Sequence, residues 1–173
     1  MKTSDSLNAL MILIPLMIPI GASGAFAAGS ETAGLFIPFF LATEVLNFIL
    51  KRLFGLILPE HISNRPSGCG SLGDNGLCLG CGAIPYPNKI TNPAGTGMPS
   101  GHTQAMGVMT GVLTLMSKNP WVILTSWLVS GLVGWQRISS KCHTFLQVIS
   151  GFIIGLSGAP VFKKIKQTFK KRQ

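Results

Sequence analysis

The sequence predicts an all-α fold, a multi-pass bundle of about five transmembrane helices with one long extramembrane loop that contains cysteines. Two observations lead to this class. Only 11% of the 173 residues are charged and 47% are hydrophobic, whereas an ordinary soluble domain has about 25% charged residues. The apolar residues also fall in long blocks, at 7–28, 35–58, 103–116, 120–135 and 145–162. No internal repeat or linker divides the chain, so we expect a single domain over residues 1–173.

The blocks differ in how well they fit a bilayer, which needs roughly 17 to 25 apolar residues per helix. The first, second and fifth are long enough, and the third and fourth become so when their Gly, Ser and Gln flanks are counted. The first block has a second interpretation, because Lys2, the apolar stretch and Ala25-Phe26-Ala27 together resemble a cleavable secretory signal. We favour five spans with the first one retained.

A basic tail follows the last block and sets the predicted orientation. The net charge is +9, and six basic residues fall within 163–173. Basic residues directly after a span favour a cytoplasmic C-terminus near anionic lipid headgroups. We do not expect nucleic acid as a partner, because the chain has no interleaved aromatic platform and no recognisable reading module.

Five spans and a cytoplasmic tail place the N-terminus and the 59–99 and 136–143 loops together on the opposite, luminal face. Loops as long as 59–99 are usually functional or disordered, and its three cysteines favour a stapled cap. Cys69, Cys78, Cys81 and Cys142 would share an oxidising compartment. Disulfides are one interpretation, with three possible pairings; free thiols and a zinc site at Cys78-x-x-Cys81 are the others.

Ionisable residues interrupt the second block. Glu44, Asn47 and Lys51 are spaced by three and four residues and therefore share one helical face. Charged groups within a bilayer usually face the protein interior, so Glu44 and Asn47 could support Lys51 as a cation aimed into a site. Alternatively, Lys51 extends to the headgroups.

A helix start is predicted at Pro99-Ser100-Gly101-His102. Ser100 is a natural N-cap and Gly101 allows close approach of a ligand to the backbone. A helix N-terminus attracts anions, and a histidine in its first turn could protonate a leaving group. Taken alone, a capped helix start is the commoner explanation.

The same predicted face also carries Arg65, Arg137 and His143. Arginine binds phosphate oxygens as a fork, and helix N–H groups can complete the cradle. Metal-assisted hydrolysis is disfavoured, because hard metals need carboxylates and this face has only Glu60 and Asp74. We expect no metal and no cofactor.

Glycines recur at spacings of three or four, at 107 and 111, at 131 and 134, and at 151 and 155. Such spacings let helix backbones approach closely in a membrane. They predict helix packing before any ligand role.

The order of these residues resembles a known signature. Lys51, Arg65-Pro66, "PSGH" at 99–102 and "RISSKCH" at 137–143 are similar to the three-part motif of the type 2 phosphatidic acid phosphatase superfamily of histidine phosphatases. The resemblance covers residues 47–155. Three departures are a longer spacing between Lys51 and Arg65, Gln136 in place of the usual serine, and Gln147 in place of the usual aspartate.

A narrower resemblance explains the glutamine. The stretches "RPSGCG", "GMPSGHTQ" and "HTFLQVISG" are similar to the dolichyl diphosphate phosphatase branch, in which glutamine stands at this place. Gln147 then has two possible roles. Its oxygen can accept a hydrogen bond from His143 Nδ1 and fix the tautomer, or it can close a capping box with Thr144.

The resemblance implies a role for each site residue. His143 is the nucleophile that forms a phosphohistidine, His102 is the acid and base, and Gln147 orients His143. Phosphate-binding residues are Lys51, Arg65, Ser100, Gly101 and Arg137.

The implied activity is hydrolysis of the terminal phosphate of a dolichyl-type diphosphate on the luminal face of the endoplasmic reticulum, where the released carrier would serve glycosylation. The implied partners are the lipid phosphate and membrane lipids. Alternatives are a phosphatidic acid or related lipid phosphate phosphatase, and a non-catalytic phosphate-binding membrane protein. The sequence does not predict the oligomeric state.

Overall fold

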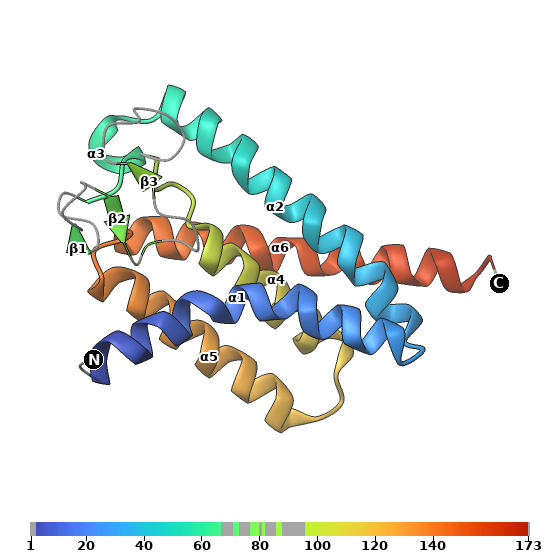
Figure 1. Cartoon of the computed structure of the whole chain (residues 1–173). Helices are drawn as coiled ribbons and strands as arrows, with labels where there is room; N and C mark the ends of the chain where they lie inside the picture. Colours follow the sequence, from blue (N-terminus) through green and yellow to red (C-terminus); the bar gives the residue numbers. More distant parts are fainter. Residues whose placement is uncertain are drawn as a thin grey trace.

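The computed structural model describes residues 3–66, 71–72, 77–79, 81, 86–87 and 96–172. Within this part, long helices run side by side between the two ends of the molecule (Figure 1). They are α1 (Thr3–Ala27), α2 (Glu31–Ile57), α4 (Gly101–Met116), α5 (Pro120–Ser139) and α6 (Phe145–Lys170). A single-turn helix, α3 (Glu60–Ser63), follows α2.

A small sheet lies in the predicted 59–99 loop and was not predicted. Its strands are β1 (Ser71–Leu72), β2 (Leu77–Leu79) and β3 (Tyr86–Pro87). They pair antiparallel in the order β1-β2-β3, with Ser71 opposite Leu79 and Leu77 opposite Pro87. The all-α class therefore describes the bundle but misses this sheet, because strands of two or three residues are too short to show alternation in the sequence.

Polar caps fix where the helices begin. Ser30 Oγ accepts a hydrogen bond from the Ala33 N–H at 3.3 Å at the start of α2. Asn119 Oδ1 accepts from the Trp121 N–H at 2.9 Å at the start of α5, where Pro120 occupies the first turn. Each cap satisfies a backbone donor that the helix itself leaves unpaired.

Glycines bring α4 and α6 into close contact, as their spacing predicts. A Cβ atom at Gly107 would overlap the carbonyl oxygen of Phe152, and one at Gly155 would overlap that of Gln104. Gly111 and Gly151 are similarly confined by the facing helix. The prediction is wrong for Gly131, where an added Cβ would meet open space.

Two helices in the described part are long and apolar enough to cross a membrane, α2 and α6. A shorter apolar stretch lies at Leu13–Ala25. The expected number of about five membrane spans remains a prediction. The helix α4 has only 16 residues, and most of it between Thr103 and Val112 is buried. Buried in this way, α4 needs little apolar surface of its own against lipid.

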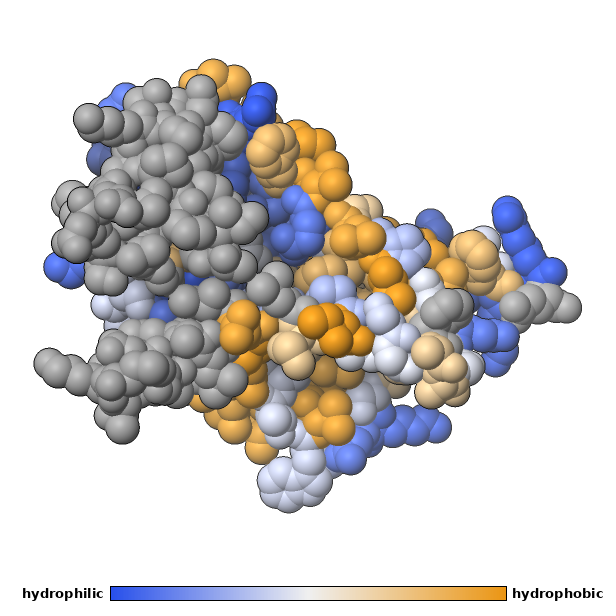
Figure 2. Space-filling model, in the orientation of Figure 1, coloured by the Kyte–Doolittle hydropathy of each residue, from blue (hydrophilic) through white to orange (hydrophobic). Residues whose placement is uncertain are grey.

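The helix ends sort into two groups (Figure 1). The start of α1, α3, the sheet, the start of α4 and the α5–α6 turn lie at one end, and the α1–α2 turn and the C-terminus lie at the other. The sequence predicted this grouping of the loops. Figure 2 shows hydrophobic surface along the middle of the bundle and hydrophilic residues near the C-terminus.

Candidate active site

The predicted site residues meet where α3, the segment before α4 and the α5–α6 turn come together. His143 lies in the turn that ends in Thr144, the N-cap of α6, and its side chain is only 2% exposed. Its backbone N–H donates to the carbonyl of Arg137 at 3.1 Å, which closes the turn. A histidine buried in this way needs a defined partner for each ring nitrogen.

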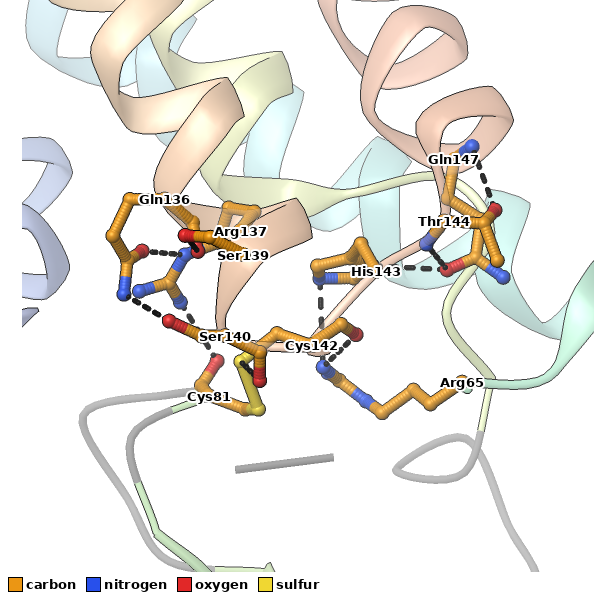
Figure 3. The surroundings of a disulfide bond; sticks show 10 residues. All are labelled: Arg65, Cys81, Gln136, Arg137, Ser139, Ser140, Cys142, His143, Thr144 and Gln147. Atoms are coloured by element: carbon orange, nitrogen blue, oxygen red, sulfur yellow. Dashed lines mark hydrogen bonds between the residues drawn. A yellow bond between two sulfur atoms is a disulfide. The ribbon is translucent and has the colours of Figure 1, made fainter. Parts of the chain in front are cut away.

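Both ring nitrogens of His143 have close neighbours (Figure 3). Nδ1 lies 3.2 Å from Gln147 Oε1, and Nε2 lies 3.4 Å from Arg65 Nη1. Because an amide oxygen only accepts, Nδ1 carries the proton and Nε2 keeps its lone pair. Arg65 Nη1 also donates to the Cys142 carbonyl at 3.1 Å, which holds the guanidinium beside the ring.

Gln147 makes a full set of hydrogen bonds. Its Oε1 also accepts from the Thr144 N–H at 3.2 Å, and Thr144 Oγ1 accepts from the Gln147 N–H at 3.3 Å. Its Nε2 donates to the carbonyls of Ile62 at 2.9 Å and Asn64 at 2.7 Å. The two contacts weighed for Gln147, to His143 and in a capping box, are therefore present together, and the amide also fixes the segment that leads to Arg65.

The charge of His143 is set by its surroundings. Burial is the main cause that lowers its pKa well below the usual value, and the positive charges of Arg65, Lys51 and His102 lower the pKa further. The hydrogen bond to Gln147 acts in the opposite direction but is outweighed. The lowered pKa favours the neutral imidazole at physiological pH.

Arg137 is fully buried and is held by two partners. Its Nε donates to Gln136 Oε1 at 2.6 Å and its Nη1 to the Cys81 carbonyl at 3.2 Å. Gln136 Nε2 in turn donates to Ser140 Oγ at 2.8 Å. Within the described part of the chain, Arg137 Nη2 is buried without a hydrogen-bond partner, so one donor of a fixed guanidinium is available for an anion.

Ser100 occupies the N-cap position of α4, as predicted, but its side chain makes no capping hydrogen bond. Its Oγ is buried and has no partner among the described residues. Its backbone is fixed, because the Ser100 N–H donates to the Gln147 carbonyl at 3.0 Å. A buried hydroxyl without a partner is costly unless a ligand binds it, and this one lies at the positive end of a helix.

Gly101 and His102 form the first turn of α4. A Cβ at Gly101 would lie 3.1 Å from Asn47 Oδ1, so this glycine makes room for a side chain of α2. His102 is half-buried and is close enough to act electrostatically on His143.

Lys51 faces the interior, which excludes the interpretation that it extends to the headgroups. Its Nζ donates to the carbonyls of Pro99 at 2.7 Å, Thr96 at 3.3 Å and Gly97 at 3.5 Å. Asn47 on the same face donates to Gln104 Oε1 at 2.9 Å rather than supporting Lys51. The ammonium thus holds the segment that precedes Ser100.

A disulfide joins Cys81 to Cys142 and lies beside the histidine (Figure 3). It selects one bond from the pairings that the sequence left open and shows that these two cysteines are not free thiols. Cys69 and the side chain of Cys78 lie outside the described residues. No group of three or more His, Cys, Asp or Glu within the described ranges is placed to hold a metal ion.

Gln136 is the site residue whose contribution the sequence did not reveal. The sequence showed only that it stands where serine is usual. Its contact with Arg137 Nε was not predictable, since two sequence neighbours on a helix point in different directions and meet only through their long side chains.

Fold and site together define a helical bundle with a buried histidine and arginine donors placed for an anion. A family model described as the PAP2 superfamily matches residues 33–171, and the chain belongs to this superfamily. Its members are phosphatases, and membership implies a lipid phosphate substrate and association with a membrane. The match extends past the resemblance at both ends and includes most of the basic tail. Searches of curated proteins and of solved structures found no match.

Proposed function

We propose that the protein is a metal-independent membrane phosphatase that removes the terminal phosphate of a polyprenyl diphosphate of the dolichyl type. One observation carries the proposal. Ser100 Oγ and Arg137 Nη2 are both buried without a partner in the described structure. The backbones of these two residues are tied to the His143 turn, because the Ser100 N–H donates to the Gln147 carbonyl and the Arg137 carbonyl accepts from the His143 N–H. A buried donor without a partner costs about 1 to 3 kcal/mol, and phosphate oxygens would satisfy both.

His143 is the nucleophile in this proposal. Its Nε2 attacks the terminal phosphorus in line, a P–N bond forms, and the bond from phosphorus to the bridging oxygen breaks. The Nδ1 proton stays on the ring and is held by Gln147 Oε1 at 3.2 Å. This contact stabilises the positive charge that develops on the imidazole.

His102 completes both half-reactions. It donates a proton to the bridging oxygen as the lipid monophosphate leaves, and then accepts a proton from the water that attacks the phosphohistidine. The P–N bond breaks and inorganic phosphate is released. The position of His102 in the first turn of α4 places it next to the helix N–H groups that would hold the same phosphate.

The equatorial oxygens are held by Ser100 Oγ, the Gly101 N–H, Arg65 and Arg137. These donors stabilise the charge that spreads over the phosphoryl group in the transition state. Lys51 adds positive charge, and through the Pro99 carbonyl it fixes the backbone that carries Ser100.

The polyprenyl substrate and the luminal location in the endoplasmic reticulum rest on the resemblance of "GMPSGHTQ" and "HTFLQVISG" to the dolichyl diphosphate phosphatases. The structure adds a reason to treat Gln147 as functional. Its amide makes hydrogen bonds through both its oxygen and its nitrogen, which supports a role in orienting His143. A phosphatidic acid phosphatase would use the same cradle and is separated from this proposal by substrate preference alone.

The test is phosphate release by purified protein in detergent micelles with a metal chelator present. Substrates are dolichyl diphosphate, phosphatidic acid and p-nitrophenyl phosphate. We expect the wild type to prefer the diphosphate and His143→Ala to release phosphate at the background rate. His61→Ala is the matched control, since His61 is exposed on α3, and should retain activity. Equal release by the wild type and His143→Ala would show that the protein is not a histidine phosphatase.

A further inference from the structure

A groove opens between α4, α5 and α6 at the end of the bundle that carries the candidate site. Its volume is about 490 Å³, within the usual range of small-molecule pockets, roughly 300 to 1,000 Å³. Its lining is mostly apolar and includes Trp127, Ile138, Phe145, Ile149 and Phe152. The phosphate chemistry described above uses none of these side chains.

Three lining residues of the groove are sequence neighbours of phosphate-site residues. Thr103 follows His102, Ile138 follows Arg137, and Val148 follows Gln147. Thr103 Oγ1 donates to the carbonyls of Ser100 at 3.2 Å and Val148 at 2.9 Å. The same turns of α4, α5 and α6 therefore carry phosphate-site residues and groove residues, on different faces of each helix.

Three polar residues of the lining already have partners within the protein. Thr103 Oγ1 is bonded as above, Ser130 Oγ donates to the Ser126 carbonyl at 2.8 Å, and Trp127 Nε1 donates to Thr114 Oγ1 at 3.1 Å. These groups do not require a polar ligand. The surface offered to an occupant is then hydrocarbon and aromatic, which favours an apolar chain.

Two glycines of α5 contribute to the open space of the groove. Both Gly131 and Gly134 line it. A Cβ at Gly131 would meet nothing within 4 Å, whereas one at Gly134 would lie 3.1 Å from Val148 Cγ1. Gly131 therefore plays no part in close helix packing, and its lack of a side chain leaves room for an occupant.

We propose that this groove binds the hydrocarbon chain of the lipid phosphate substrate next to its headgroup, an inference that rests on the proposed function. A molecule whose phosphate contacts Ser100 and Arg137 has its chain starting at the level of Thr103 and Ile138. The chain can then run between α5 and α6 toward Trp127.

The first test is the variant Gly131→Leu, whose side chain would occupy the groove. Substrates are dolichyl diphosphate and isopentenyl diphosphate, which shares the headgroup but has only a five-carbon chain. We expect the ratio of their KM values, long over short, to rise about tenfold, equivalent to excluding roughly two methylenes from a buried site. Leu132→Trp is the control, because Leu132 is exposed and does not line the groove; its ratio should stay at the wild-type value. An unchanged ratio in Gly131→Leu overturns the proposal.

A second test does not depend on hydrolysis. Trp127 and Trp135 line the groove, so in a Trp121→Phe background a lipid with a brominated chain should quench their fluorescence when it enters. We expect brominated phosphatidic acid to quench at lower mole fraction than phosphatidylcholine with the same chains, and Gly131→Leu to abolish this difference. Equal quenching by the two lipids would mean that the groove holds bulk bilayer lipid and would overturn the inference. Preferential quenching by phosphatidic acid without phosphate release would refute the proposed phosphatase activity, while the proposal that the groove binds the chain of a lipid phosphate would stand.

Discussion

Replacing Gln147 with glutamate tests whether the site needs an amide at this position. The substitution keeps the size of the side chain and supplies the carboxylate type of acceptor that is usual in the superfamily. In this chain, however, the Nε2 end of Gln147 lies 2.9 Å from the Ile62 carbonyl and 2.7 Å from the Asn64 carbonyl. A carboxylate oxygen placed there would face two other oxygens and repel both.

The magnitude follows from these contacts. A protonated glutamic acid can donate to one of the two carbonyls and leaves the other unpaired, which costs about 1 to 3 kcal/mol. If this cost falls on the orientation of His143, kcat/KM drops about 5- to 150-fold. An ionised side chain loses both donated bonds and adds repulsion, so the defect should deepen as pH rises. Gln147→Ala removes four hydrogen bonds, worth roughly 2 to 6 kcal/mol of stability.

The assay is kcat/KM for phosphate release between pH 5.5 and 8.5, with melting temperatures measured in the same detergent. We expect Gln147→Glu to come nearest to the wild type at the acidic end and to fall behind at the alkaline end. Glutamate activity equal to the wild type at every pH would refute the idea that the donors to Ile62 and Asn64 matter. Unchanged turnover in Gln147→Ala would leave only the capping role.

Three further predictions concern the surroundings of Gln147. Gln136→Leu removes the acceptor of Arg137 Nε and should raise KM about tenfold. Gln136→Glu keeps an acceptor oxygen and should have a KM near that of the wild type. An equal rise of KM in both variants would argue against a role of Gln136 in positioning Arg137. Cys142→Ser removes a disulfide between residues 61 apart and should cost about 4 kcal/mol of stability by the chain-entropy model. In thermal melts, Cys81→Ser should give the same loss of stability. A clearly smaller loss in either variant would contradict the model. Since the pKa of His143 is lowered in the folded state, the unfolded chain binds more protons below about pH 6.5. As the pH is lowered below about 6.5, the free energy of unfolding should therefore decrease, by up to about 1.4 kcal/mol per pH unit. The variant His143→Asn should lack this contribution to the pH dependence of stability.

Much of the site follows from local sequence. The helix start at Ser100, the capping box of Thr144 and Gln147, and the glycine spacings within α4 and within α6 all depend on residues within one or two turns of each other. Short-range spacing determines which backbone groups a helix end leaves unpaired and which helix face lacks side chains. The residues of the superfamily motif could be found for the same reason, since each part of the motif is a short stretch.

The bonds that place these residues relative to one another were decided only by the tertiary structure. Gln147 meets Asn64 across 83 residues, Arg65 meets His143 across 78, and Lys51 meets Pro99 across 48. No periodicity records such contacts, because each depends on how α2, α4 and α6 pack and on where the loops between them close. The sequence by itself determined the helices and the chemical groups of the site. Packing decided that Cys81 pairs with Cys142, that Lys51 holds a backbone segment, and that Ser100 Oγ and Arg137 Nη2 are left buried without a protein partner.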